Sequence, residues 1–443
     1  MIPWRPSPEI QVVYVDAGVD YIEKPETIAE WARTFNDEKI AEHGWKVWAA
    51  ITKDSGQGYP AKCGEETIGE VRLPIWDTWV SEVQLFPLEP GDVVFRPYHP
   101  ITQSGMSDVL SFNKYNMAFE LYVKANKLNS AETLLKANNG LPETPISKRT
   151  IDEVLKMKAP VNGIMLKPAY WAVKKGEASL LPYWKGPGLE INGTVNPRKP
   201  TERTWTQVVL VNDTGRPASE LPREFEIVVY PDEGPRTIKV KPDKVTTVED
   251  FYAVPLTNED IEYIKSGNIF QFGGVEVRDL ECGDWALLVA MHVTTVEWKN
   301  WTWQTFWWTP NRETSPQPGV NPPWTNYNMA SAYYMVGPDD KPHIAFNPHL
   351  EPPIVGANYM NQFDRGAESN CITCHRVAAF PTVNADPNPA NFLLGSYRAK
   401  GKVTEGDAYF RNRLQTIFMW TPVLRTQMSK EYKDNYKKYL RDR

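Results

Sequence analysis

The chain is poor in cysteine, in net charge and in long apolar runs. Of its 443 residues only four are cysteines, and the formal net charge is −6. A slightly acidic balance gives no electrostatic reason to expect nucleic-acid binding. No apolar run reaches the roughly 18 residues that a membrane-spanning helix needs, so we expect no transmembrane segment. The sequence also has no P-loop, GxGxxG or GxSxG motif in a supporting context, and no acid/base pair of carboxylates stands out.

The most informative feature that is present is a pair of cysteines followed at once by a histidine. Cys371 and Cys374 are separated by two residues, and His375 comes next. CxxCH is the pattern for covalent attachment of a c-type haem. Each thiol forms a thioether to one vinyl group of the porphyrin, and the adjacent imidazole becomes the proximal ligand of the iron. The sequence therefore predicts one covalent haem c held by Cys371, Cys374 and His375.

Other interpretations of this cysteine pair are weaker. A four-thiolate zinc site needs a second CxxC pair, which the sequence lacks. A thioredoxin-like redox pair is expected near a βαβ pattern, whereas loop-like residues flank the pair Cys371 and Cys374 on both sides. A disulfide or a metal site without haem is the alternative that stays open.

The sixth ligand of the iron separates an electron carrier from a haem enzyme. His292 lies in an apolar run that predicts a buried strand, and a buried imidazole needs partners for its ring nitrogens. Met419 lies downstream of the motif, where small cytochromes c have their methionine ligand. We rank His292 above Met419 as an iron ligand; Met428, His343 and His349 are further candidates. Hydrogen bonding of His292 within the protein and core packing of Met419 are the ordinary alternatives.

The remaining two cysteines, Cys63 and Cys282, stand alone in the sequence. They predict either a disulfide in an oxidising compartment or two separate buried thiols. The residues around Cys63 are expected to form a loop. Seventeen tryptophans would suit burial around a macrocycle, but core packing is the default role of these side chains.

Pattern and composition predict an α+β fold in three parts. Residues 1–160 are expected to be a mainly helical N-terminal region. Residues 161–350 are expected to form a β-rich, antiparallel domain, because polar and apolar residues alternate there between turn signals. Residues 351–443 are expected to be the haem-binding segment, with short helices.

Several individual elements are predicted within these parts. Apolar spacing indicates helices over 25–51, 114–136 and 407–419 and a short helix over 258–266. Residues 284–296 and 301–309 are predicted to pair as a hairpin. Because both faces of the first strand are apolar, that strand should lie in the centre of a sheet.

Three short segments carry a family resemblance. Residues 291–295 (MHVTT), residues 301–306 (WTWQTF) and residues 369–371 (SNC), which lead into the CxxCH motif, resemble large single-haem bacterial c-type cytochromes. The resemblance covers about the C-terminal third and implies an exported, periplasmic redox protein. No leader is visible at the start of the chain, so we expect it to have been removed. The chain departs from small cytochromes c in lacking a Met-Pro ligand motif and in having a loop-like stretch before Cys371.

The sequence thus favours a periplasmic single-haem cytochrome that exchanges electrons with a redox partner protein. One alternative is a haem oxidoreductase, peroxidase-like or of another type, with an open distal site and a small-molecule substrate; the length of the chain favours it. The other alternative is a docking subunit of a larger redox complex.

Overall fold

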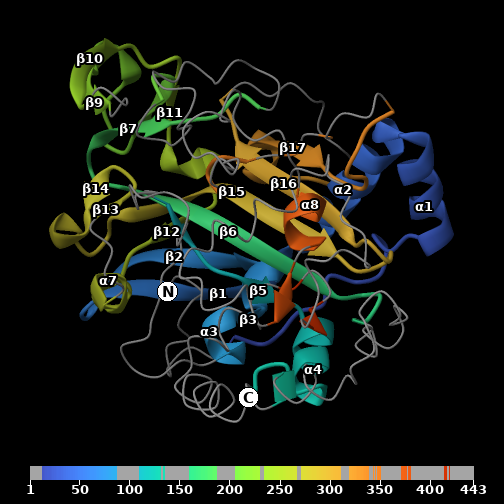
Figure 1. Cartoon of the computed structure of the whole chain (residues 1–443). Helices are drawn as coiled ribbons and strands as arrows, with labels where there is room; N and C mark the ends of the chain where they lie inside the picture. The colour runs from blue at the N-terminus through green and yellow to red at the C-terminus, as the bar shows by residue number, and fades with distance from the viewer. Residues whose placement is uncertain are drawn as a thin grey trace, which may run out of the picture.

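An eight-stranded sheet forms the centre of the protein in the computed structural model (Figure 1). The structure describes residues 12–86, 109–130, 133–134, 159–186, 205–229, 234–266, 271–310, 319–338, 343, 345, 347–350, 371–376, 378–380, 414–416 and 419. The sheet runs in the order β17 (Tyr327–Ser331), β16 (Thr302–Trp308), β15 (Trp285–Thr295), β6 (Ile164–Val173), β5 (Lys114–Tyr115) and β3 (Val80–Ser81), with β12 (Ala253–Pro255) beside β15 and β4 (Leu110–Ser111) beside β6.

Smaller sheets and helices surround this sheet. The outer strands are β1 (Asp54–Cys63) with β2 (Glu66–Pro74); β7 (Ala178–Pro182), β8 (Val208–Asn212) and β11 (Val245–Thr246); β9 (Phe225–Val229) with β10 (Arg236–Val240); β13 (Gln271–Phe272) with β14 (Val275–Glu276); and β18 (Ala379–Phe380) with β19 (Leu414–Gln415). The α-helices are α1 (Pro25–Thr34), α2 (Asp37–Ile51), α3 (Glu82–Leu85), α4 (Met117–Ala125), α7 (Asn258–Ser266) and α8 (Cys371–Arg376). The 3₁₀-helices are η1 (Ile75–Thr78), η5 (Ala218–Glu220), η6 (Val248–Asp250), η7 (Val277–Asp279) and η8 (Trp324–Asn326). Within the described ranges no helix is long and apolar enough to span a bilayer.

Strand β15 is the central strand, as its apolar run predicts. It pairs antiparallel with β6 on one side and with β16 on the other, so the predicted hairpin is confirmed. Successive side chains of a strand point to opposite faces of the sheet. Met291 and Phe306 are register partners and share one face, whereas His292 and Thr305 share the other.

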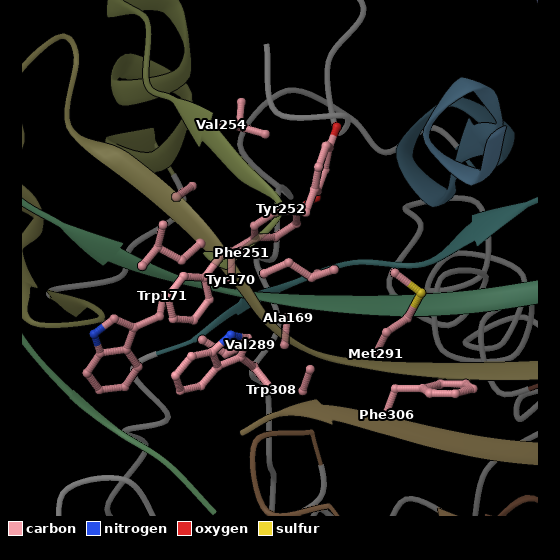
Figure 2. Packing of buried hydrophobic residues seen from close by; sticks show 14 of the residues in the cluster. Ala169, Tyr170, Trp171, Phe251, Tyr252, Val254, Val289, Met291, Phe306 and Trp308 are labelled. Carbon is pink, nitrogen blue, oxygen red and sulfur yellow. The ribbon is translucent and has the colours of Figure 1, made fainter. Parts of the chain in front are cut away.

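Aromatic stacking fixes helix α2 to the first of these faces. Trp48 of α2 stacks on Phe306 with 4.0 Å between ring centroids. Figure 2 shows Phe306 next to Met291 in the buried cluster that fills this part of the core. Helix α2 begins where it does because Asn36 caps it by accepting a hydrogen bond from the backbone N–H of Lys39 at 3.2 Å. His292 points to the opposite face of the sheet, which α2 does not cover.

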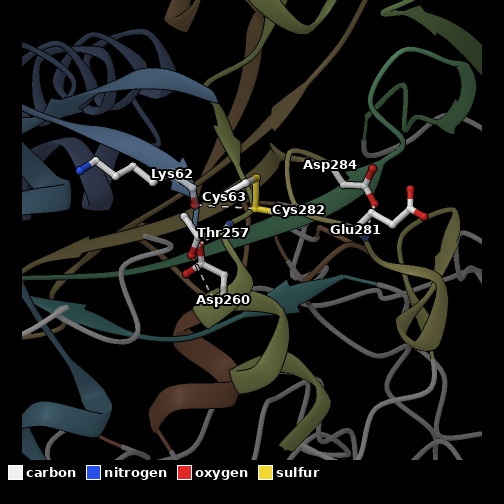
Figure 3. The surroundings of a disulfide bond; sticks show 7 residues. All are labelled: Lys62, Cys63, Thr257, Asp260, Glu281, Cys282 and Asp284. Atoms are coloured by element: carbon white, nitrogen blue, oxygen red, sulfur yellow. Dashed lines mark hydrogen bonds between the residues drawn. A yellow bond between two sulfur atoms is a disulfide. The ribbon is translucent and has the colours of Figure 1, made fainter. Parts of the chain in front are cut away.

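A disulfide joins Cys63 to Cys282, which settles the open question of their pairing (Figure 3). Cys63 ends β1, and Cys282 lies in the turn that precedes β15. The bond therefore attaches the β1–β2 hairpin to the entry of the central strand. It links residues 219 positions apart in the sequence.

Removing this disulfide is expected to lower the free energy of unfolding. A crosslink across so long a loop restricts the unfolded chain strongly, and loss of a native disulfide typically costs about 2–5 kcal/mol. Guanidinium unfolding of a Cys63→Ser/Cys282→Ser double variant measures the change. A reductant should lower the stability of the parent chain and leave the double variant unaffected. Equal unfolding midpoints for the parent and the variant would show that the bond contributes nothing.

A buried ion pair joins strand β5 of the central sheet to the 3₁₀-helix η1. The Lys114 ammonium on β5 donates to the Asp77 carboxylate and to its backbone carbonyl, each at 2.5 Å, and the Tyr252 hydroxyl donates to the second carboxylate oxygen at 2.6 Å. Both charged side chains are 1% exposed. Burial lowers the pKa of Lys114, and the adjacent carboxylate of Asp77 opposes that shift. These bonds tie η1 to β5.

We expect Lys114→Met to destabilise the fold by about 3–5 kcal/mol, because it leaves the Asp77 carboxylate buried without its counter-charge. The matched control is Lys265→Met on α7, whose partner Glu262 is 76% exposed. An exposed pair contributes less than about 1 kcal/mol. Urea unfolding of both variants gives the comparison, and losses of similar size would contradict the assigned role of Lys114.

The α+β class is confirmed, but the N-terminal part differs from the prediction. Strands β3, β4 and β5 precede residue 160 and belong to the same sheet as β6, so the expected helical region does not form a separate unit in the described ranges. Two long strands, β1 and β2, stand where a loop was expected around Cys63. Their buried positions alternate, but polar residues, glycine and proline between them hide the pattern.

Other predicted elements are partly right. The helix over 258–266 is confirmed, whereas the helix over 25–51 is divided at Phe35, whose backbone is left-handed with φ 53°. The helix expected over 114–136 is shorter: α4 spans Met117–Ala125, and Lys114–Tyr115 is strand β5. The expected helix over 407–419 is wrong where the structure describes it, because Leu414–Gln415 pairs with β18.

Candidate functional site

The CxxCH motif forms the short helix α8. Helical spacing places positions 371, 374 and 375 on one face, because residues three and four apart are neighbours on a helix surface. In Figure 1, α8 lies over strands β15 and β16. This position agrees with a ring contact between His375 of α8 and Trp303 of β16, whose centroids are 4.4 Å apart.

Cys371 is buried within a largely apolar cluster. The residue is 3% exposed. The sulfur lies 3.9 Å from the backbone oxygen of Ala345. The other buried members of the cluster include Ile372, Trp301, Trp303, Leu414 and Met419. A buried cysteine in such surroundings fits the formation of a thioether next to the apolar edge of a porphyrin.

His292 lies on the face of the central sheet that α8 covers. Its register partners are Lys167 on β6 and Thr305 on β16, and paired residues share a face. Trp303 comes two residues before Thr305 and therefore points the same way. His292 and His375 are thus brought to one region of the molecule from distant parts of the sequence.

The surroundings of His292 keep its imidazole neutral. Both ring nitrogens are buried, although the residue as a whole retains some exposure. Burial holds the pKa of His292 well below its ordinary value, and the nearby charges of Lys167 and His375 act in the same direction. The neutral imidazole is the form that binds metal ions. His375 contacts Trp303, which shares this face of the sheet with His292.

Met419 lies near the same site. It is 3% exposed and belongs to the same cluster as Cys371. Its backbone is fixed by Thr416, whose hydroxyl donates to the Met419 carbonyl at 2.7 Å. The structure therefore places both candidates for the sixth ligand, His292 and Met419, around α8. Met428 lies outside the described residues.

The other described histidines have partners elsewhere. His343 makes a 2.7 Å hydrogen bond to the backbone oxygen of Ser331. The ring of His349 packs against Trp205 with 5.0 Å between centroids. His43 is in hydrogen-bond contact with the Tyr333 hydroxyl on the side of the sheet that α2 covers. None of these three contacts involves α8.

The site brings together residue types that bind haem iron. No group of three or more His, Cys, Asp or Glu side chains in the described ranges could hold a metal ion. Haem iron needs only one or two protein ligands, because the porphyrin supplies four nitrogens. A buried thiol, an adjacent imidazole and a second, neutral imidazole are a suitable donor set for that group.

Sequence reasoning did not single out two residues of this site, Trp303 and Lys167. The sequence does contain one indication of Trp303's position. Side chains alternate between the two faces along each strand of the hairpin, so Trp303 shares a face with His292 once the register is known. The register itself depends on pairing between distant strands, which a single sequence does not display. No family model matches the chain, and no curated protein or solved structure matches it. Function therefore has to be inferred from the site residues.

Proposed function

We propose that the chain is an exported, periplasmic c-type cytochrome that transfers single electrons through one covalent haem. The observation that carries this proposal is the CxxCH motif on α8, whose His375 contacts Trp303 on the face of the sheet that also carries His292. A haem with two strong axial ligands supplies a reversible one-electron couple. A redox partner protein is implied, because an electron carrier needs a donor and an acceptor.

Each site residue has a distinct role in this proposal. Cys371 and Cys374 tether the porphyrin, and His375 is the proximal ligand. His292 is the sixth ligand, since burial keeps it neutral and the register of β15 points it to the face beneath α8. Met419 is the alternative sixth ligand. The apolar cluster around Cys371 would keep water away from a haem held there.

The periplasmic location is supported by the covalent chemistry of the cysteines. Disulfides persist in oxidising compartments and are rare in the cytosol. The bond between Cys63 and Cys282 therefore favours a compartment outside the cytoplasm. Haem attachment to CxxCH also normally takes place there, so both features favour the same compartment.

Absorption spectroscopy of the matured protein tests the proposal. We expect a c-type pyridine haemochrome, a six-coordinate low-spin iron in both oxidation states and a reversible one-electron titration. A high-spin iron that binds carbon monoxide or reacts with peroxide would favour the haem oxidoreductase instead. A native mass well above the 50.6 kDa of one chain would favour the docking subunit. Absence of a haemochrome spectrum would remove the redox assignment.

A further inference from the structure

The ring of Trp303, on strand β16 of the central sheet, contacts the ring of His375. The two ring planes are inclined by 41° with 4.4 Å between their centroids. The indole is 4% exposed, and its N–H donates to the backbone oxygen of Asn300 at 3.0 Å. A buried ring with a satisfied N–H has one preferred orientation. Trp303 therefore presents a fixed surface to the imidazole of His375.

A second tryptophan, Trp301, packs against the ring of Trp303. Trp301 stacks on it with 5.9 Å between centroids and an interplanar angle of 19°, and Phe119 of α4 meets Trp301 edge-on at 5.9 Å. Trp301 has φ 55°, in the left-handed region that a bulky side chain rarely adopts. Its backbone N–H is bonded to the Trp298 carbonyl at 2.8 Å.

Such a conformation persists only where the surrounding contacts impose it, and it is found preferentially at functional sites. Here it places the Trp301 indole between α4 and Trp303. The turn between β15 and β16 is thus built around a stack of two tryptophans that ends at His375.

We propose that Trp303 is a positioning residue that fixes the rotation of the His375 imidazole about its bond to iron. The inference rests on the proposed function, in which His375 is the proximal ligand. An imidazole held through one nitrogen can rotate about that bond unless neighbouring groups restrict it, and such neighbours tune the metal. Trp303 is the restricting group, and Trp301 keeps Trp303 in place.

Electron paramagnetic resonance of the ferric protein provides the test, because its g values respond to the orientation of the axial ligand planes. Trp303→Ala should shift the largest g value and broaden its line, whereas Trp303→Phe, which keeps a ring but loses the bond to Asn300, should give a smaller shift. The matched control is Trp307→Ala. Trp307 lies on the same strand and face, is also buried, and packs against Trp184 at 4.7 Å. The control should keep the parental g values.

The inference is overturned if Trp303→Ala and Trp303→Phe both keep the parental spectrum, or if Trp307→Ala shifts it equally. Should Trp303→Ala fail to fold, Trp303→Phe and the parent chain still decide the question. In the diamagnetic ferrous parent, the indole protons of Trp303 must show a nuclear Overhauser effect to the ring protons of His375, and its absence also overturns the inference. The pyridine haemochrome of each sample separates this outcome from failure of the proposed function, since a loaded haem with unchanged g values rejects only the role of Trp303.

Discussion

A chain carrying Cys371→Ser and Cys374→Ser is expected to hold no covalently bound haem after expression with a c-type haem maturation system. The reason is chemical: a serine hydroxyl does not add to the porphyrin vinyl groups as a thiol does. Haem staining of a denaturing gel, with the absorption spectrum, gives the measurement. The expected loss is complete, because the other two cysteines of the chain are joined to each other.

A single substitution tests whether each cysteine forms its own thioether bond. Cys371→Ser alone should leave one thioether, and the pyridine haemochrome band should shift towards that of a haem with one free vinyl group. The control is Cys63→Ser/Cys282→Ser, which removes the same number of cysteines and should still carry haem in its folded fraction. Covalent haem on the Cys371→Ser/Cys374→Ser chain would contradict the assignment of the motif.

His292→Ala is expected to convert the iron from six-coordinate low spin to high spin. The substitution removes the second imidazole from the face of the sheet beneath α8, while Cys371, Cys374 and His375 still attach the haem. Absorption and electron paramagnetic resonance spectra report the spin state directly. The variant should also gain affinity for carbon monoxide, because a coordination position becomes open.

Met419→Leu is the matched control for His292→Ala. Leucine conserves the apolar volume of a methionine, so the buried cluster should be retained at a cost below about 1.5 kcal/mol. We expect this variant to keep the low-spin spectrum of the parent. The opposite pair of results, low spin for His292→Ala and high spin for Met419→Leu, would show that Met419 is the sixth ligand.

The parts of the fold that could be predicted are those specified by local patterns. The β15–β16 hairpin follows from two apolar segments with a polar turn between them, and α7 follows from its helical spacing. In each case, neighbouring residues carry the information.

What could not be predicted depends on contacts between distant segments. Strands β1 and β2 have too few consecutive apolar residues to stand out, and they are stabilised by packing on the core and by the Cys63–Cys282 bond. Strand β19 lies in an apolar stretch that has helical spacing. It is a strand because it pairs with β18, which is more than 30 residues earlier in the sequence. Tertiary pairing overrides local preference in such short strands.

The residues of the candidate site also fall into two groups, those that the sequence indicates and those that only the tertiary structure brings together. The motif from Cys371 to His375 can be recognised in the sequence because the proposed haem attachment uses neighbouring residues. His292 could be proposed from its place in an apolar strand, but its proximity to His375 depends on how α8 packs on the sheet. Trp303 could not be assigned to the site from sequence, since its contact with His375 requires both the hairpin register and that packing.

The most direct test of the central claim is the intact mass of the chain after maturation with c-type haem attachment machinery, measured under denaturing conditions. Covalent attachment through Cys371 and Cys374 predicts the mass of the polypeptide plus one haem. The bare mass of the polypeptide, from material shown to be folded and exported, would contradict it.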